Sequence, residues 1–439
     1  MKLLIISPVI PYPLSEGGKI ALYSMVDYLR HKCSITLLLF TYNETDIEYV
    51  NTLKYLWNNV DIDVLQANKS IIVKHYAGYK RFLNFLVKNI ENVKFRINKL
   101  IEPANSVKKF EPVKPAEKLK YLISFAQARE PEIIDKIVKK IKTVQPDLVQ
   151  LEFVEAMDLV LCIPKGIKKL LVHVEIRFRR VKTEINIVSE HIGSYGEYAQ
   201  NLSELLELGL CEKFDGIITF SEDDKRHLSL KTQGKNIYSS PYAVLDKEIL
   251  NIQNEDLMIN KLVFVGFENH LPNKDAVEWY INEMSKNIYD KYGFVLHIIG
   301  NWSNEFKMHH ANNKTIVFTG YVDDLSGYCK NSIMLVPLRI GSGIRTKILH
   351  SMAWGIPVIT TSIGSEGIID NDKIFLTANS PNEFIEAIDK ITLDKELHKS
   401  MVANAQSVVK NYYSQKSAGD KRFSFYQSVL NDELINEHN

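Results

Sequence analysis

Short apolar runs alternate with stretches of helical character along the first half of the chain. These runs cover residues 2–7, 34–40, 61–65, 147–151, 169–174 and 216–220. A parallel strand buried on both faces is apolar throughout, and it needs a crossover, usually a helix, to reach its parallel neighbour. The alternation therefore predicts a doubly wound α/β domain, with helices on both faces of a parallel sheet.

The same pattern restarts in the second half of the chain. A new apolar run at 261–266 is followed by a helix expected from about Asp275, and further runs cover residues 295–300, 315–319, 332–338 and 357–361. The polar segment 246–260 between the two series has no strand pattern, so we place the domain boundary there. We expect an N-terminal domain over 1–245 and a C-terminal domain over 260–414, facing each other across a cleft at the carboxyl ends of their strands. The last helix, in 415–439, is expected to cross back and complete the first domain.

The composition excludes several classes of protein. The 439 residues carry a net charge of +1, which gives no overall field for nucleic acid. The four cysteines form no C-x-x-C pair, so neither a zinc site nor a disulfide framework is predicted. The first apolar run is too short for a signal peptide, and none approaches the roughly 20 residues of a membrane span. We therefore expect a cytoplasmic protein.

Residues 69–120 interrupt the strand–helix rhythm with a strongly basic segment. They hold 13 Lys and Arg against 4 Glu and no Asp. Bulky apolar and basic residues alternate at helical spacing, and two interpretations of an insertion over about 69–130 stay open. One is a helix lying on an anionic membrane surface, which would place the protein at the inner face of the membrane, near lipid-linked acceptors. The other is a solvated helical insertion packed on the first domain.

The segment 337–359 carries the clearest chemical signal. A buried strand ends in a turn containing Gly341 and Gly343, which allow the backbone to approach a ligand closely. A helix follows, and its free N–H groups and dipole favour a phosphate. Arg345 and Lys347 add positive charge near the helix start, where it opposes the dipole unless an anion is present. A diphosphate meets that demand, whereas a packing turn with two solvated cations is the simpler alternative.

The chain resembles glycosyltransferase family 4, the retaining group with the GT-B fold of two Rossmann-like domains. The resemblance lies in G-S-G-x-R-x-K-x-L and the following residues, at 341–358, and in P-N-x-D-A-x-x-W at 272–279. It extends to G-x-E-G at 364–367 and to the first loop, with its prolines at 11 and 13 and Gly17-Gly18. The match is weak over residues 45–145.

The resemblance implies roles for individual residues. Arg345, Lys347 and His173, which ends a buried strand of the first domain, would be catalytic. The donor would be held by Gly17, Gly18, Asn273, Lys274, Tyr321, Val322, Gly341, Ser342, Gly343, His350 and Glu366. Glu152 and Glu155 follow another strand and are candidates to orient the acceptor or to act as a base. His350 departs from the family pattern, which places a ribose-binding Glu there.

The expected function is transfer of a sugar, with retention, from a nucleotide sugar to a glycan or lipid-linked acceptor. Bacterial cell-surface polysaccharide or lipopolysaccharide synthesis is the process that the resemblance implies. No metal or cofactor is expected, because Arg345, Lys347 and the helix start can neutralise the leaving diphosphate. A GT-B sugar-nucleotide epimerase and a non-catalytic sugar-nucleotide binder remain as alternatives. A dinucleotide-dependent oxidoreductase is disfavoured, since no G-x-G-x-x-G follows the first strand.

Overall fold

The computed structural model describes residues 1–66, 129–188, 194–232, 234–250, 258–341, 343–369 and 373–432. The basic segment 69–120 and nearly all of the insertion predicted over 69–130 lie outside these ranges. Both interpretations of that segment therefore remain predictions. No described helix combines the length and the apolar character needed to cross a bilayer.

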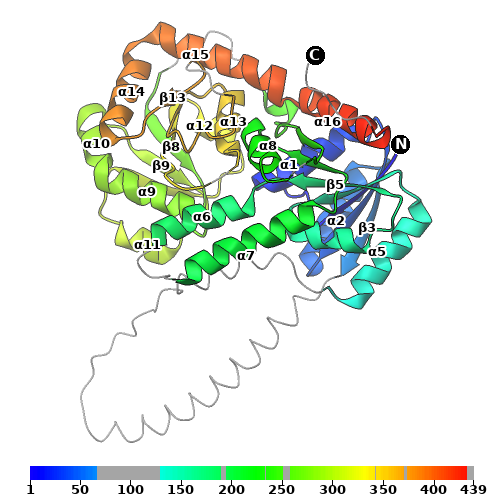
Figure 1. The fold of residues 1–439 in the computed structure, drawn as a ribbon. Helices are drawn as coiled ribbons and strands as arrows, with labels where there is room; N and C mark the ends of the chain where they lie inside the picture. The colour runs from blue at the N-terminus through cyan, green and yellow to red at the C-terminus, as the bar shows by residue number, and fades with distance from the viewer. Residues whose placement is uncertain are drawn as a thin grey trace, which may run out of the picture.

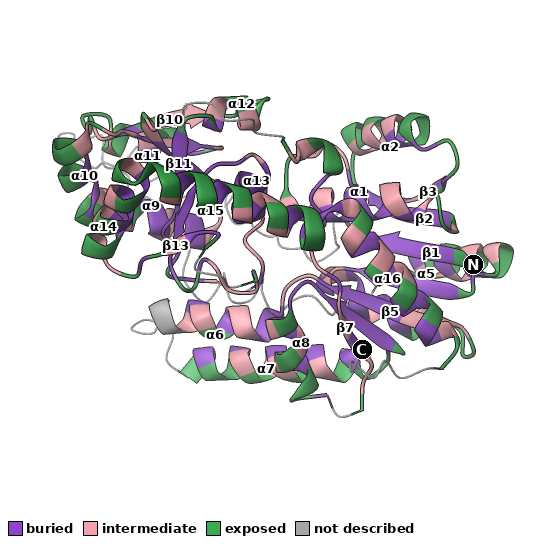
Figure 2. Cartoon of the chain, turned by 90° about the horizontal axis from the view of Figure 1, so that it is seen from above, coloured by how far each residue is buried: buried purple, intermediate pink, exposed green. Residues whose placement is uncertain are grey.

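The N-terminal domain is built on a seven-stranded sheet in the order β3-β2-β1-β4-β5-β6-β7. All neighbouring strands are parallel, and the inner strand β1 places Leu3 between Ile35 and Leu148. The strands are β1 (Lys2–Ser7), β2 (Ser34–Thr41), β3 (Asp61–Gln66), β4 (Leu148–Glu152), β5 (Lys168–His173), β6 (Gly216–Thr219) and β7 (Ile237–Ser239). Residues of the inner strands are almost all buried, whereas the edge strands β3 and β7 are partly exposed (Figure 2).

Helices cover both faces of this sheet (Figure 1). The helical segments of this domain are α1 (Gly17–Leu29), α2 (Glu44–Leu56), α5 (Pro131–Val144), the 3₁₀ segment η1 (Val154–Cys162), α6 (Arg177–Val188), α7 (Ser194–Cys211) and α8 (Glu222–Ser229). The pattern of α5 shows why they pack in this way. Ile133, Ile137 and Ile141 recur every four residues and are all buried, so one apolar stripe meets the sheet.

The C-terminal domain repeats the design with a six-stranded parallel sheet in the order β10-β9-β8-β11-β12-β13. Its strands are β8 (Lys261–Val265), β9 (Leu296–Ile299), β10 (Ile316–Gly320), β11 (Ser332–Val336), β12 (Val358–Thr360) and β13 (Leu376–Thr377). Its helices are α9 (Leu271–Glu283), α10 (Ser285–Tyr292), α11 (Asn304–His309), α12 (Leu325–Cys329), α13 (Thr346–Ala353), α14 (Pro381–Leu393) and α15 (Lys395–Val408).

Two crossings join the domains, and they are tied to each other. The first contains the short 3₁₀ turn η3 (Asp246–Glu248), and the second leads through a π-helical turn, η4 (Val409–Tyr413), into α16 (Gln415–Leu430). The backbone N–H of Val244 donates to the carbonyl of Tyr413 at 2.7 Å, so the two crossings run side by side. Helix α16 then packs against α1 of the first domain, at the side of the molecule away from α14 (Figure 1).

The predicted fold class of two facing parallel-sheet domains is confirmed. Two details of the predicted elements were wrong. The helix expected from about Asp275 begins at Leu271, because Pro272 occupies the first turn, where its missing N–H costs nothing. The edge strands β7 and β13, three and two residues long, were not predicted, since such short segments carry no periodicity.

Candidate active site

A cavity of about 800 Å³ lies between the two domains, on the carboxyl side of both sheets. Its walls come from the loop after β1, from the end of β5 and α6, and from the loops after β8, β10 and β11. The crevice at strand ends is where open α/β sheets bind ligands, and this volume suits a nucleotide-sized molecule.

Two helices point their N-termini into this cavity from opposite domains. Helix α1 begins at Gly17 and α13 begins at Thr346, and the two residues touch. A Cβ atom added to Gly17 would lie 2.9 Å from Cγ2 of Thr346, and one added to Gly18 would lie 3.0 Å from the ring of Phe153. The missing side chain of Gly17 allows the two domains to approach closely, that of Gly18 leaves room for Phe153 of the same domain, and both predicted glycines line the cavity.

The predicted glycine turn leads into α13. Gly341 and Gly343 have φ angles of 127° and 76°, which favour glycine, and both line the cavity. A Cβ atom on Gly341 would come within 2.7 Å of Nη2 of Arg345, so this glycine also makes room for the guanidinium. Ser342 lies outside the described residues. Gly355 has a φ of 69° directly after the helix, as expected of a residue that ends it.

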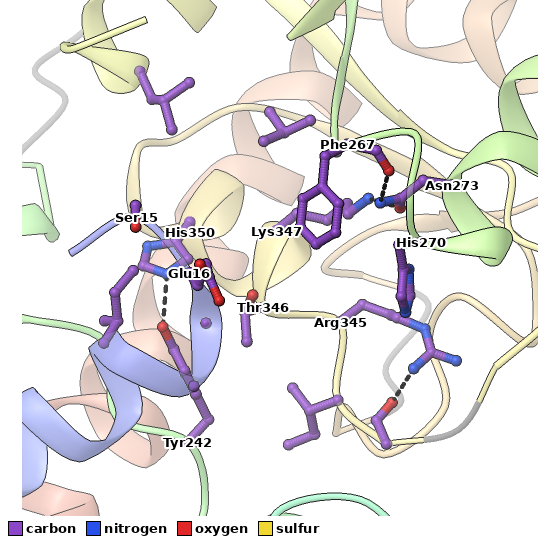
Figure 3. Close-up of a pocket in the computed structure, with 18 of the residues that line it drawn as sticks. Ser15, Glu16, Tyr242, Phe267, His270, Asn273, Arg345, Thr346, Lys347 and His350 are labelled. Carbon is purple, nitrogen blue, oxygen red and sulfur yellow. Dashed lines mark hydrogen bonds between the residues drawn. The ribbon is translucent and has the colours of Figure 1, made fainter. Parts of the chain in front are cut away.

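Arg345 and Lys347 both line the cavity beside the start of α13 (Figure 3). Nη1 of Arg345 donates to the carbonyl of Gly343 at 2.7 Å. Nζ of Lys347 donates to Oδ1 of Asn273 at 2.9 Å and lies 4.2 Å from the ring centre of Phe264. Burial, reinforced by the Arg345 charge, lowers the pKa of Lys347 to about 7. Of the described carboxylates, none forms an ion pair with Lys347, so an incoming anion would stabilise its charged form.

Asn273 and Lys274 are neighbours in sequence, but only Asn273 faces the cavity. Asn273 lines the cavity, and its Nδ2 donates to the carbonyl of Phe267 at 3.1 Å. Lys274 instead pairs with Glu268 at 3.5 Å and does not belong to the cavity wall. Successive residues of a helix point about 100° apart, which explains why one faces the ligand and the other does not.

Tyr321 and Val322 line the cavity from the loop after β10. Tyr321 is 77% exposed, which leaves its ring free to cover a ligand. His350 lies on α13 one turn beyond its start, and it is buried. Its ring meets Tyr242 and Glu248 from the first crossing between the domains.

His173 is not on the cavity wall. It ends β5 as predicted, but it is buried, and its Nε2 lies 2.8 Å from Oε1 of Glu207 on α7. Glu207 also accepts the backbone N–H groups of Arg177 and Phe178, at 2.8 and 2.7 Å, and so caps the start of α6. The structure therefore gives His173 a packing contact beside the cavity, while the next residues, Val174 and Glu175, line it.

The two acceptor-side candidates also lie away from the cavity wall. Glu152 is buried in the first domain, where Nε2 of Gln150 donates to it, and burial raises its pKa to about 7. Glu155 on η1 forms an ion pair with Arg177. Strand ends point toward the cleft, but here Glu152 is held by Gln150 and Glu155 by Arg177, and the sequence pattern did not indicate either partner.

Glu366, predicted to hold the donor, forms a contact between the two domains. Its carboxylate forms an ion pair with Arg179 of α6, whose other amino group lies 3.1 Å from Asp224 of α8. Ser221 caps α8 by accepting the N–H of Asp224 at 3.0 Å. Glu366 does not line the cavity, although its charge acts on nearby Arg345.

Several polar residues of the cavity were not predicted from the sequence, and four of them gather around Arg180. Arg180 of α6 lies between Glu175 at 3.1 Å and Glu184 at 2.9 Å, and all three line the cavity. His270 faces them from the second domain, and burial together with the Arg180 charge lowers its pKa to about 4. The available signal was the position of Glu175 just beyond the β5 strand end. No group of three or more His, Cys, Asp or Glu side chains among the described residues could hold a metal ion.

Comparisons with known proteins agree with this architecture. Residues 259–394 match the family model described as "Glycosyl transferases group 1". A "Glycosyltransferase 1 domain-containing protein 1" from Xenopus tropicalis is 27% identical over 114 residues, which cover 26% of this chain and 32% of that protein. The "Putative glycosyltransferase YtcC" of Bacillus subtilis is 33% identical over 85 residues, 18% of this chain and 21% of that protein. The matched stretch thus spans about a third or less of these curated relatives.

Solved structures are similar over nearly the whole chain. TarM superposes with a TM-score of 0.66 at 10% identity, covering 98% of each chain. Sucrose-phosphate synthase from Thermosynechococcus elongatus gives 0.66 at 12% identity, covering 99% of this chain and 100% of that one. Anabaena HepE, solved in complex with UDP, gives 0.60 at 10% identity, covering 98% and 100%. The chain therefore has the GT-B fold, and its residues 259–394 match the glycosyl transferases group 1 family.

Proposed function

We propose that this protein is a glycosyltransferase that moves a sugar from a nucleoside diphosphate sugar to a glycan or lipid-linked acceptor. The observation that carries the proposal is the start of α13, where Arg345 and Lys347 line a cavity between two domains. Both cations lie within the span that matches the glycosyl transferases group 1 model. HepE, a protein of the same fold, was solved in complex with UDP.

The geometry suits stabilisation of a leaving diphosphate. Free N–H groups of the first turn of α13 and the positive end of its dipole face the cavity, and the two cations flank them. A second helix start, at Gly17, approaches the same place from the first domain. Fixed donors of this kind stabilise negative charge that develops as the bond to the sugar breaks.

The sugar and the acceptor would lie toward α6. Glu175, Arg180 and Glu184 offer hydrogen-bond donors and acceptors there, beside Arg345. Retention of configuration, a role in cell-surface polysaccharide synthesis and contact of residues 69–120 with an anionic membrane follow from the sequence resemblance and from composition. NMR spectroscopy of the product's anomeric centre would test retention directly.

The test begins with nucleotide binding and proceeds to turnover. A thermal-shift screen with UDP-, GDP- and ADP-sugars identifies the donor, because a ligand of the native state raises the midpoint of unfolding. Release of the nucleoside diphosphate in the presence of glycan acceptors then measures transfer. Arg345→Ala should lower kcat by about 10²–10³-fold and raise the donor KM, since it removes a charge next to the leaving group.

Lys274→Ala is the matched control. Lys274 is a cation on α9 that pairs with Glu268 outside the cavity, so its loss should leave kcat/KM within about twofold. Equal kinetics of Arg345→Ala and the wild type would refute the assignment. Conversion of the donor without any acceptor would instead identify a sugar-nucleotide epimerase, and binding without turnover across an acceptor panel would identify a non-catalytic binder.

A further inference from the structure

Three side chains form a hydrogen-bonded row along one wall of the cavity. The Tyr242 hydroxyl lies 2.9 Å from Nε2 of His350, and Nδ1 of His350 lies 2.6 Å from Oε2 of Glu248. Figure 3 shows the first of these bonds, with His350 between Tyr242 and the first loop of the chain. All three residues line the cavity, and the Glu248 side chain is 23% exposed.

The burial of Tyr242 bears on which atoms donate and which accept in this row of hydrogen bonds. Burial, together with the nearby Glu248 charge, raises the pKa of Tyr242 well above its usual value, so the phenol keeps its proton. The Tyr242 hydroxyl can therefore donate to Nε2 of His350, and in the tautomer that accepts this bond Nδ1 carries the ring proton and donates to Glu248. The imidazole thus holds the carboxylate by Oε2. Among the described residues, none forms a hydrogen bond with its second oxygen, Oε1.

The backbone of Glu248 is anchored as firmly as its side chain. Asp246 and Gln415 exchange hydrogen bonds across the two crossings, at 2.9 and 3.1 Å. On the other side, the N–H of Leu250 donates to the carbonyl of Ala353 at the end of α13, at 3.0 Å. Glu248 is therefore fixed relative to α13 before any ligand arrives, which is what a specific hydrogen-bond acceptor requires.

The position of this acceptor matches one part of a nucleotide. His350 is four residues beyond Thr346, so it lies about 6 Å along the helix axis from the end that would hold the diphosphate. Tyr321 and Val322 line the cavity on the β10 side, where a base would be covered. The group between phosphate and base is the ribose, and a carboxylate is the usual partner of a ribose hydroxyl in α/β nucleotide sites.

We propose that Glu248, positioned by His350, accepts a hydrogen bond from the ribose hydroxyls and makes the site select ribonucleoside diphosphates over their deoxy forms. This inference rests on the proposed donor site. The residue comes from the crossing between the domains rather than from α13. A deoxyribose would leave the fixed carboxylate without its partner, and sites built around a hydroxyl reject analogues that lack it.

The experiment compares the binding of matched nucleotides by titration calorimetry. UDP, GDP and ADP are measured against their 2′-deoxy and 3′-deoxy forms. The wild type should prefer the ribonucleotide over at least one deoxy form by about tenfold or more, the effect of a hydrogen bond to a charged group. Glu248→Ala should reduce this preference to about twofold or less. His350→Phe should also reduce it, because Glu248 loses its support.

Asp323→Ala is the matched control, since Asp323 is a second carboxylate on the cavity wall, from the loop after β10. It should leave the ribo-to-deoxy ratio unchanged. The inference is overturned if the wild type binds ribonucleotides and both deoxy forms equally. It is also overturned if the Glu248→Ala protein keeps the full preference. Either result leaves the donor site intact. An intact preference in His350→Phe overturns the positioning role of His350. A wild type that binds none of the three ribonucleotides refutes the donor site itself.

Discussion

Raising the pH above 7 should weaken binding of the nucleotide sugar, because of Lys347. Its ammonium group contacts Asn273 and the Phe264 ring, and burial beside Arg345 lowers its pKa to about 7. A bound diphosphate adds negative charge next to Nζ and raises that pKa again. Binding of the donor is therefore coupled to uptake of a proton by Lys347.

The sign and size of the effect follow from linkage. Below about pH 7 most Lys347 side chains are already protonated in the empty cavity, so affinity is nearly independent of pH. Above that value each binding event takes up as much as one proton, and affinity falls by as much as tenfold per pH unit. The fall ends when the pH passes the pKa of Lys347 in the complex. His270, with its pKa lowered to about 4, stays neutral over this range and does not contribute.

Calorimetry of the nucleotide sugar between pH 6 and 9 measures this slope. The intact nucleotide sugar is preferable to the free diphosphate, whose terminal phosphate would itself titrate. Buffers of different ionisation enthalpy report the number of protons taken up at pH 8. Lys347→Arg keeps a positive charge at every pH and should remove the slope, and Lys347→Met should bind weakly without a slope.

Two results would refute this reasoning. One is a wild-type affinity that does not change between pH 7 and 9. The other is a slope that persists in Lys347→Arg, which would assign the proton to a different group.

The remaining predictions concern the contacts that hold the site together. Gly17→Ala places a methyl group 2.9 Å from Thr346 and should raise the donor KM by about five- to 100-fold, because it holds the domains apart. Adding Thr346→Ala to the same chain should restore the KM. A KM that is not restored would contradict the contact. Glu366→Gln removes the ion pair with Arg179 between the domains and should raise the donor KM by up to about fivefold. The increase should be smaller in high salt, which screens the ion pair in the wild type. A larger increase that does not depend on salt would indicate direct contact with the donor. Glu207→Ala leaves the start of α6 and His173 without their shared partner, so it should lower the free energy of unfolding by about 2–4 kcal/mol. Thermal or urea unfolding would measure this loss. An unchanged unfolding midpoint would contradict the role of Glu207.

The strand pattern allowed most of the fold to be predicted. Apolar runs such as residues 2–7 and 261–266 matched β1 and β8 to within a residue, because buried parallel strands are apolar throughout. The edge strands β7 and β13 could not be predicted in this way, since they are too short for a period to show. The basic segment 69–120 lies outside the described residues, so its composition supports a prediction that the structure does not test.

The proposed donor site was likewise predicted only in part. The glycine turn and the cations at 345 and 347 share one strand–turn–helix unit, so their sequence spacing already fixes where they lie. His173, Glu152 and Glu366 were placed by their position at strand ends or in a motif, but partners from distant segments hold them away from the cavity wall. Sequence spacing carries no information about such partners.

The sequence by itself determined two parallel-sheet domains and a helix start flanked by a glycine turn and two cations, because strand burial, glycine turns and residue spacing are local properties of the chain. Only the tertiary structure decided which side chains meet across the cleft. It brought Gly17 against Thr346 and Glu248 against His350, residues that are far apart in sequence. These contacts depend on how the two sheets are oriented by the two chain segments that cross between the domains. No short stretch of sequence encodes that orientation.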